Sequence, residues 1–108
     1  MPVKELDSLG LTAISLPNPD RVIDGVYIGD LLSWVMGKAT ENDAWITIMS
    51  NVNVIAVASL ADVSAIILAE GVTLDGEVLT LAAKKGINVF TTPLSAYEIA
   101  TRLYDALK

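Results

Sequence analysis

The side chains of this chain that could take part in chemistry are small and polar, and they gather directly after apolar segments. Four stretches share this position: Gly29-Asp30, Ser50 to Asn53, Glu70 to Val72, and Thr91 to Ser95. The chain contains no histidine and no cysteine, so the usual base near neutral pH, thiol nucleophiles and zinc-thiolate sites are all missing. None of the carboxylates or hydroxyls in these stretches has an evident activating partner in the sequence. We therefore expect no enzyme, no cofactor and no metal site.

The charge balance and the apolar runs narrow the choice of partners. Thirteen acidic and seven basic residues give a formal net charge of -6, whereas nucleic acids and anionic membranes bind clustered Lys and Arg. The uncharged run from Ala44 to Ala61 approaches the length of a membrane span, but Asn51 and Asn53 would lie near mid-bilayer. We expect no nucleic acid, no membrane segment and, because a signal peptide and cysteines are missing, a cytoplasmic location.

The polar stretches must be positioned by alternating strands and helices. Apolar periodicity and end signals predict a short helix, a strand and then three strand-helix units. In chain order they are a helix over Val3–Leu9, strand Leu11–Ser15, strand Val26–Ile28, helix Leu31–Lys38 capped by Asp30, a strand from Ala44, a helix after Ser50-Asn51, strand Ser64–Ala69, helix Gly76–Lys85, strand Asn88–Thr92, and a helix behind the Ser95/Glu98 capping box. This order predicts an α/β fold with three layers, a mainly parallel sheet of about five strands and helices on both faces.

The uncharged segment Ile46 to Leu60 decides this arrangement. It is too long for one strand, and Ser50 and Asn51 are its strongest helix-cap residues. We therefore expect the chain to bend there and to continue as a helix that is apolar on nearly every side and buried on all sides. In so small a domain, a second subunit is a natural cover for the outer side of this helix. The hydrophobic content of 53% also favours a homodimer, although another helix of the same chain would explain the pattern too.

The predicted sheet brings the four polar stretches to one edge. In parallel sheets ligands bind beyond the carboxyl ends of the strands, where helices begin and N–H groups are free. The candidate ligand-binding residues are Gly29, Asp30, Ser50, Asn51, Asn53, Gly71, Thr91, Thr92 and Ser95. The stretches contain no Lys or Arg and no phosphate-binding glycine motif. We expect a small polar ligand that is neutral or singly charged, or an anion held partly by Arg21, and no tight binding of a nucleoside triphosphate.

Several strings resemble the DRTGG domain family, which is similar to the N-terminal domain of HPr kinase/phosphorylase and also occurs in long bacterial phosphotransacetylases. They are VYIGDLL, NDAWITI, AIILAEG, AAKKGINVFTT and SAYEIATRL, and they cover Pro19 to Lys108 of a single domain over residues 1–108. The family's Asp-Arg pair falls on Ser50-Asn51, and its Thr-Gly-Gly falls on Ala69-Glu70-Gly71, where only Gly71 matches. The resemblance implies the fold, dimerisation and a regulatory or ligand-sensing role, but it does not carry a ligand site to these positions.

Two functions follow from these expectations. The first is a non-catalytic regulatory module that acts as a homodimer and binds a small polar ligand at the carboxyl ends of its strands. The second is a stand-alone interaction module that binds an unidentified protein and has no small-molecule ligand. A ligand that binds only the folded state must raise the melting temperature, so a metabolite screen separates the two.

Overall fold

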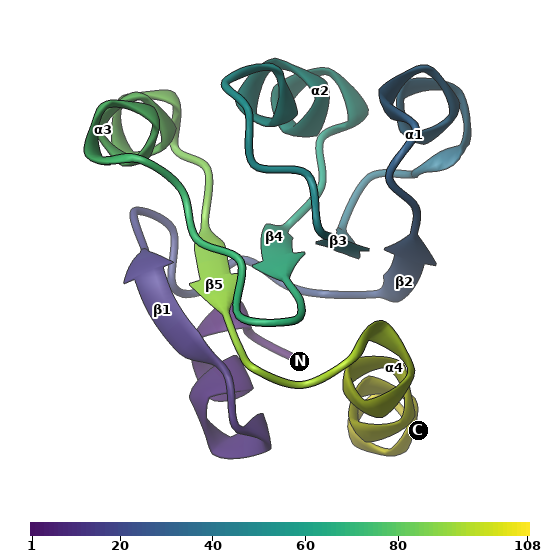
Figure 1. Cartoon of the computed structure of the whole chain (residues 1–108). Helices are drawn as coiled ribbons and strands as arrows, with labels where there is room; N and C mark the ends of the chain where they lie inside the picture. Colours follow the sequence, from purple (N-terminus) through teal and green to yellow (C-terminus); the bar gives the residue numbers. More distant parts are fainter.

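Five strands form one sheet in the computed structural model, which describes all residues from 1 to 108 (Figure 1). Their spatial order is β1-β5-β4-β3-β2. The strands are β1 Thr12–Ser15, β2 Gly25–Ile28, β3 Asp43–Thr47, β4 Ala65–Leu68 and β5 Val89–Thr91. Strands β2, β3, β4 and β5 run parallel to one another, and β1 pairs antiparallel with β5. The predicted mainly parallel sheet of five strands is confirmed.

Helices cover both faces of this sheet, as predicted (Figure 1). Helices α1 Leu32–Lys38, α2 Asn53–Ala61 and α3 Gly76–Lys85 lie on one face. This follows from the topology, because β2 to β5 are consecutive neighbours and right-handed crossovers in one direction keep their helices on one side. The 3₁₀ helix η1 Val3–Leu9 and helix α4 Ala96–Ala106 lie on the other face.

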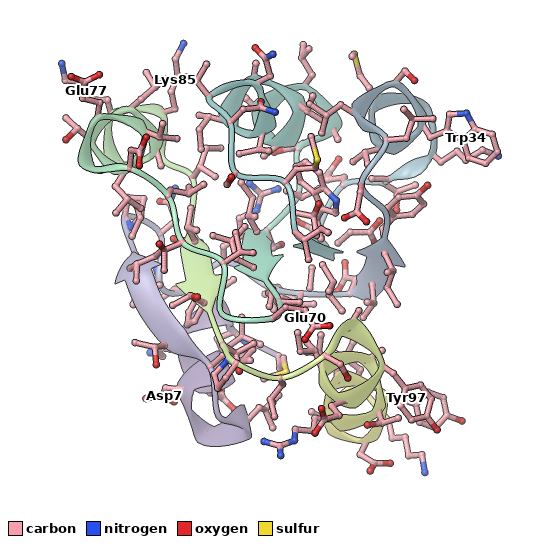
Figure 2. All side chains as sticks on the ribbon, in the orientation of Figure 1. Asp7, Trp34, Glu70, Glu77, Lys85 and Tyr97 are labelled. Carbon is pink, nitrogen blue, oxygen red and sulfur yellow. The ribbon has the colours of Figure 1, made fainter.

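Side chains fill the space on each side of the sheet and form two separate cores (Figure 2). The core under α1, α2 and α3 contains Trp45, and the core over η1 and α4 contains Phe90; both side chains are fully buried. Strands β3 and β4 are buried along their whole length. A strand covered on both faces has no polar side to alternate with, which explains the continuous apolar run in the sequence.

The bend predicted after β3 is confirmed, but its capping differs from the prediction. Helix α2 begins at Asn53, and its N-cap residue Val52 already has helical dihedral angles. The main-chain oxygen of Asn51 accepts a hydrogen bond from Val54 N–H, and its side-chain oxygen accepts one from Asn53 N–H. The Ser50 side chain forms no hydrogen bond, so its predicted role as a helix cap is wrong. The turn is closed by Asn51, whose amide reaches its own main chain two residues ahead.

Helix α2 is not buried on all sides within one subunit, which corrects the prediction made from its composition. Val54, Ile55, Val57 and Ala58 are buried against the sheet, whereas the Leu60 side chain is 71% exposed. Helices α1 and α3 flank α2 and leave its outer side open. No helix of the chain is both long enough and apolar enough to cross a membrane.

The ends of the other helices follow the sequence signals, with one exception. Gly10 and Gly86 end η1 and α3 in the left-handed conformation, and Ser95 and Glu98 form the predicted capping box of α4. The exception is Asp30, because α1 begins one residue later than predicted and its N-cap residue is Leu31, with no side-chain cap. The Asp30 carboxylate is directed at strand β3 instead.

Candidate functional site

The four polar stretches lie together at the carboxyl ends of the strands, because β2, β3, β4 and β5 are parallel and each stretch follows one of these strands. Their spatial order is the order of the strands. Gly29-Asp30 is therefore next to the Ser50 to Asn53 loop, and the Glu70-Gly71 turn is next to Thr91 to Ser95. Hydrogen bonds at these strand ends show which of the nine candidate residues are committed to the fold.

Asp30 links the ends of β2 and β3. Its Oδ1 atom accepts a hydrogen bond of 2.8 Å from Thr47 Oγ1 and one of 3.0 Å from Ile48 N–H. Trp45 Nε1 donates to the neighbouring Gly29 carbonyl at 2.8 Å, so both residues of this stretch are held in place by β3. The Oδ2 atom of Asp30 has no partner, and the residue is exposed. Asp30 is thus a fixed carboxylate with one oxygen open to solvent.

The loop after β3 lies beside this carboxylate and carries unpaired donors. Ser50, Asn51, Val52 and Asn53 are all exposed. The main-chain N–H groups of Ser50, Asn51 and Val52 form no hydrogen bond within the chain, and neither does the Ser50 hydroxyl. Together with Asp30, this loop offers both an acceptor and several donors to a polar molecule.

The loops after β4 and β5 are bonded to each other. Glu70 N–H donates to Leu94 O and Gly71 N–H donates to Thr92 O, both at 2.9 Å. The Thr91 hydroxyl donates to Val72 O at 2.6 Å. These loops lead to opposite faces of the sheet, toward α3 and α4, which is the place where open α/β sheets hold a ligand crevice. Here the crevice is closed by main-chain hydrogen bonds.

The side chains of Thr92 and Ser95, two of the remaining candidates, also form hydrogen bonds within the chain. The Thr92 side chain is 2% exposed, and its hydroxyl donates to Gly10 O at 3.0 Å. The Ser95 hydroxyl accepts from Glu98 N–H in the capping box. Gly71 is exposed and its backbone has a φ of 77°. The groups that remain available to a ligand are therefore concentrated at the ends of β2 and β3.

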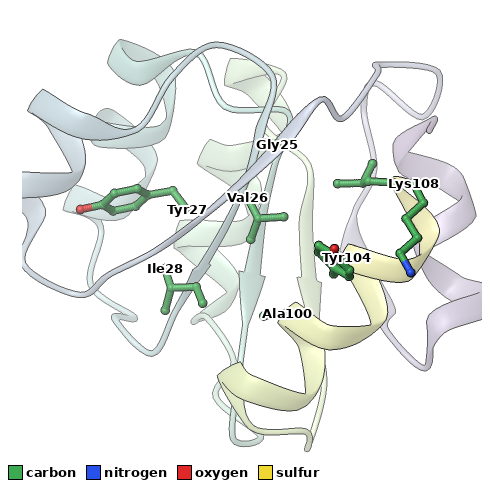
Figure 3. Close-up of a pocket in the computed structure, with 8 residues that line it drawn as sticks. Gly25, Val26, Tyr27, Ile28, Ala100, Tyr104 and Lys108 are labelled. Atoms are coloured by element: carbon green, nitrogen blue, oxygen red, sulfur yellow. The ribbon is translucent and has the colours of Figure 1, made fainter.

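Two surface cavities are present, and neither is lined by Asp30, Ser50 or Asn51. A groove of about 650 Å³ runs between β2 and α4 (Figure 3). A second groove of about 490 Å³ lies between α2 and α3 and includes Asn53, the one candidate residue that lines a cavity. No group of three or more acidic side chains is close enough to hold a metal ion.

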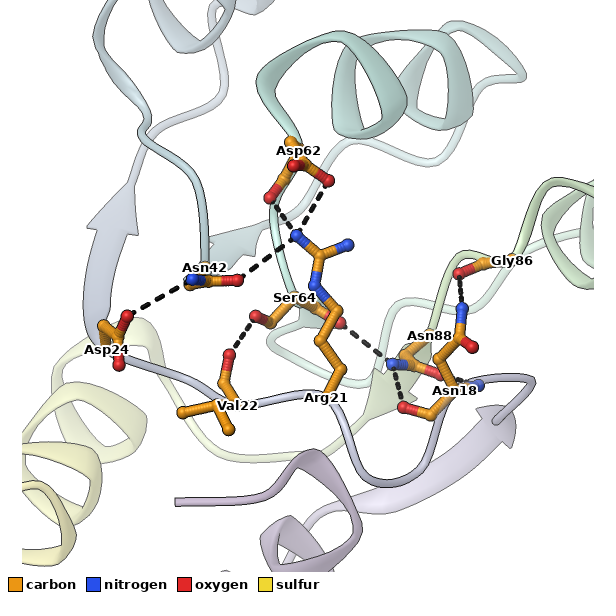
Figure 4. A network of polar contacts seen from close by, with 9 residues as sticks. All are labelled: Asn18, Arg21, Val22, Asp24, Asn42, Asp62, Ser64, Gly86 and Asn88. Carbon is orange, nitrogen blue, oxygen red and sulfur yellow. Dashed lines mark hydrogen bonds and ion pairs between the residues drawn. The ribbon is translucent and has the colours of Figure 1, made fainter.

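Arg21 lies at the amino ends of the strands, opposite the candidate site at their carboxyl ends. This corrects the expectation that Arg21 would help to hold an anion at the site. Its guanidinium donates to the main-chain oxygen of Asp62 and, at 2.8 Å, to Asp62 Oδ1, and also contacts Asn42 Oδ1 (Figure 4). Asp62 follows α2 and leads into β4, so this ion pair fixes the amino ends of the strands. The candidate site has no Lys or Arg in its four stretches and carries the carboxylates of Asp30 and Glu70.

The one clear pKa shift in the chain is also remote from the site. The Asp20 carboxylate accepts a hydrogen bond from the exposed Lys4 ammonium at 2.9 Å and raises the pKa of Lys4. The pair joins η1 to the turn before β2.

The sheet order, the crossover helices on one face and α4 on the other define a three-layer α/β domain. The family model of the DRTGG domain matches residues 17–106, and the chain belongs to the DRTGG domain family. No curated protein matches the chain. A similar solved structure is that of the CBS and DRTGG domains of the regulatory region of Clostridium perfringens pyrophosphatase, complexed with its activator diadenosine tetraphosphate.

That similarity has a TM-score of 0.68 at 21% identity, covering 93% of this chain and 44% of the other. The chain thus spans less than half of the regulatory region that it resembles. The resemblance puts the first glycine of the family's Thr-Gly-Gly at Glu70, whose backbone is left-handed with a φ of 59°. The turn conformation that glycine favours is therefore present without the glycine.

Proposed function

We propose that the chain is a non-catalytic regulatory module that senses a small polar ligand at the ends of β2 and β3 and acts as a homodimer. The observation that carries the proposal is that two kinds of free group lie near each other. One is the Oδ2 atom of Asp30, whose Oδ1 atom is fixed by two hydrogen bonds, and the other is the set of unbonded N–H groups of Ser50, Asn51 and Val52. Such a set suits a molecule that both donates and accepts hydrogen bonds, such as a hydroxylated or amine-bearing metabolite. Membership in a family with a regulatory relative supports the role.

The charges at the carboxyl ends of the strands determine which class of ligand we expect. The pyrophosphatase regulatory region is bound to a nucleotide polyphosphate, whereas the four stretches here carry two carboxylates that form no ion pair, and they carry no cation. A polyphosphate would meet only uncharged donors, the main-chain amides and the Ser50 hydroxyl, and would be repelled by Asp30 and Glu70. We expect neutral or singly charged metabolites to bind here, and ATP or diadenosine tetraphosphate to bind weakly.

The test is a thermal-shift screen of a metabolite panel, followed by titration calorimetry of each hit. A ligand at one hundred times its Kd stabilises the folded state by about 2.7 kcal/mol and raises the melting temperature. Asp30→Asn keeps a side-chain oxygen for Thr47 and Ile48 but loses the charge, so it should fold normally and bind a cationic hit at least tenfold more weakly. Glu77→Gln, which removes an exposed carboxylate from α3, is the matched control and should bind as the wild type does.

A second candidate is an interaction module without a ligand. The main-chain bonds that close the crevice between β4 and β5 favour it, since they occupy the position where related α/β sheets bind small molecules. A panel in which no compound shifts the melting temperature would favour this candidate. Tight binding of a nucleoside triphosphate with no loss in Asp30→Asn would contradict the ligand class that we propose.

A further inference from the structure

The groove between β2 and α4 belongs to a larger surface, which we call the β2-side surface. It consists of the edge of β2, the adjacent side of α4 and the outer side of α1. The groove is lined by Gly25, Val26, Tyr27, Ile28, Ala100, Tyr104, Leu107 and Lys108. Ile28 is 52% exposed and Tyr104 is 68% exposed, so large apolar side chains remain in contact with water at both walls (Figure 3).

The aromatic residues of the chain are divided between the core and this surface. Trp45 and Phe90 are buried. The other four aromatic residues lie on the β2 side, namely Tyr27 and Tyr104 in the groove and Trp34 and Tyr97, which project from α1 and α4 past β2 in Figure 2. Tyr97 and Tyr104 are seven positions apart and share one side of α4. Aromatic side chains exposed together are typical of protein interfaces and of their energetic centres.

The backbone of β2 presents an unpaired edge to this surface. Strand β2 pairs only with β3, and Gly29 N–H donates to Ile46 O. In a parallel pair the bonds to the neighbour come from alternate residues, so the N–H and C=O groups of Val26 and Ile28 point away from β3. The strand contains no proline, lysine or bulge of the kind that protects free edges. It is therefore open to pairing with another strand.

Charges at the two ends of β2 favour a second copy as the occupant. Lys108 lies at the Gly25 end of the groove, 3.6 Å from Asp105 and 5.1 Å from the centre of the Tyr104 ring. Lys38, 5.2 Å from the centre of the Trp34 ring, ends the helix that leads back to the same end of the sheet. The exposed Asp30 follows the other end of β2. The nearby Asp24 accepts a hydrogen bond from Asn42 (Figure 4). An antiparallel pair of β2 strands around a two-fold axis brings Asp30 of each copy toward the lysine end of the other.

We propose that two copies of the chain dimerise through antiparallel pairing of their β2 edges, giving one sheet that runs through both subunits. This inference rests on the homodimer of the proposed function and names its interface. The alternative interface, the outer side of α2, exposes Val52, Ala56, Ser59 and Leu60, which include no aromatic residue and no unpaired strand edge.

The test is the mass in solution, measured by size-exclusion chromatography with light scattering over a range of concentrations. Ile28→Pro removes an outward N–H from the edge, and Tyr104→Asp places a carboxylate in the groove without touching the backbone of β2. Leu60→Asp is the control on the outer side of α2. We expect a wild-type dimer, a dimer in Leu60→Asp, and a dissociation constant raised at least a hundredfold in Tyr104→Asp and Ile28→Pro, with circular dichroism showing that each variant is folded.

The outcomes separate this inference from the proposed function. If Leu60→Asp becomes a monomer and folded Tyr104→Asp remains a dimer, the homodimer stands and the β2 pairing is wrong. A wild-type monomer at high concentration overturns both the homodimer and the pairing, while ligand sensing is decided by the thermal-shift screen. If Ile28→Pro does not fold, Tyr104→Asp alone decides the question.

Discussion

At the scale of single residues, Asp30 and Glu70 show how the main chain is fixed at the ends of the strands. Asp30 replaces its predicted capping bond with two bonds to the end of β3. Glu70 and Gly71 form two successive left-handed residues, which direct their N–H groups at the loop after β5. Both arrangements fix main-chain positions at the strand ends, where the proposed ligand would form hydrogen bonds with main-chain groups.

The left-handed backbone of Glu70 leads to a prediction about stability. A residue with a Cβ atom is less stable than glycine in this conformation by about 1–2 kcal/mol, part of which is offset by the greater freedom of unfolded glycine. The Glu70 side chain forms no hydrogen bond or ion pair. We expect Glu70→Gly to raise the free energy of unfolding by up to about 1 kcal/mol in urea denaturation.

A second left-handed residue provides the contrast for this prediction. Asp62 has a φ of 58°, but its carboxylate pairs with Arg21 at 2.8 Å. Asp62→Gly therefore relieves the same backbone cost and loses the ion pair, and we expect it to gain less than Glu70→Gly. A loss of more than 1 kcal/mol in Glu70→Gly would reveal a contact of the Glu70 side chain that the proposed site does not contain.

At the scale of elements, the sequence predicted the order of strands and helices and most of their ends. Gly86 and the Ser95/Glu98 box carry local signals that depend only on neighbouring residues, and the structure confirms both. The hydrogen bonds of the Asp30 and Thr92 side chains could not be predicted, because their partners Thr47 and Gly10 come from distant parts of the chain. The prediction that Arg21 helps to hold an anion was wrong for the same reason. Its pairing with Asp62 depends on the path of the turn before β2, which the local sequence does not give.

Asn88 is the clearest group that sequence analysis missed. It is 1% exposed, and its side-chain amide bonds Asn18 N–H, Asn18 O and Ser64 O. The sequence showed it only as the polar first residue of a strand. A buried amide with all of these bonds satisfied fixes the turn after β1 to the sheet, and nothing in the local pattern distinguishes it from an exposed asparagine.

Helix α2 shows how far composition can mislead. The sequence predicted an apolar helix buried on all sides, and the structure buries one side only. Val57 faces the sheet and is 4% exposed, whereas Ala56 beside it is exposed. Composition counts apolar residues but not the side on which they lie, and the outer side of α2 exposes Leu60 as well as the small Ala56 and Ser59.

This difference within α2 predicts opposite effects of the same charge. Val57→Asp would bury an unpaired carboxylate among apolar side chains and should lower the free energy of unfolding by about 4 kcal/mol or more. Ala56→Asp, one residue earlier on the exposed side, should change it by less than about 0.5 kcal/mol. Thermal melts followed by circular dichroism measure both. Equal destabilisation by the two variants would mean that the outer side of α2 is also covered in solution.

At the scale of the whole molecule, the segment before the family match is part of the fold. The family model begins at residue 17, yet η1 and β1 precede it and complete one face and one edge of the sheet. Val3 and Leu6 are fully buried in the core that contains Phe90. Val3 N–H also donates to Arg21 O at 2.8 Å, which ties η1 to the turn before β2. The sheet therefore ends at β1 on one side, where the pairing with β5 is irregular between Ala13 and Ser15, and at the regularly paired strand β2 on the other side.

This arrangement predicts the effect of removing residues 1–16. The deletion takes away the buried side chains of Val3, Leu6 and Leu11, each worth about 1.5–3 kcal/mol. It also makes β5 the edge strand in place of β1 and removes part of the cover of the Phe90 ring. The summed loss is close to the whole stability of a small domain. We expect residues 17–108 to lose their cooperative thermal transition and to aggregate, as measured by differential scanning calorimetry and light scattering.

Full-length Leu6→Ala is the matched comparison, because it creates a cavity in the same core but keeps β1 on the edge of β5. It should lower the free energy of unfolding by about 2–5 kcal/mol and remain free of aggregates below its melting temperature. If residues 17–108 melt cooperatively and stay dispersed, the matched family segment folds by itself. In that case η1 and β1 add stability without being required for the sheet. If instead Leu6→Ala aggregates as readily as the deletion, the loss of core burial, and not the exposed β5 edge, is the cause.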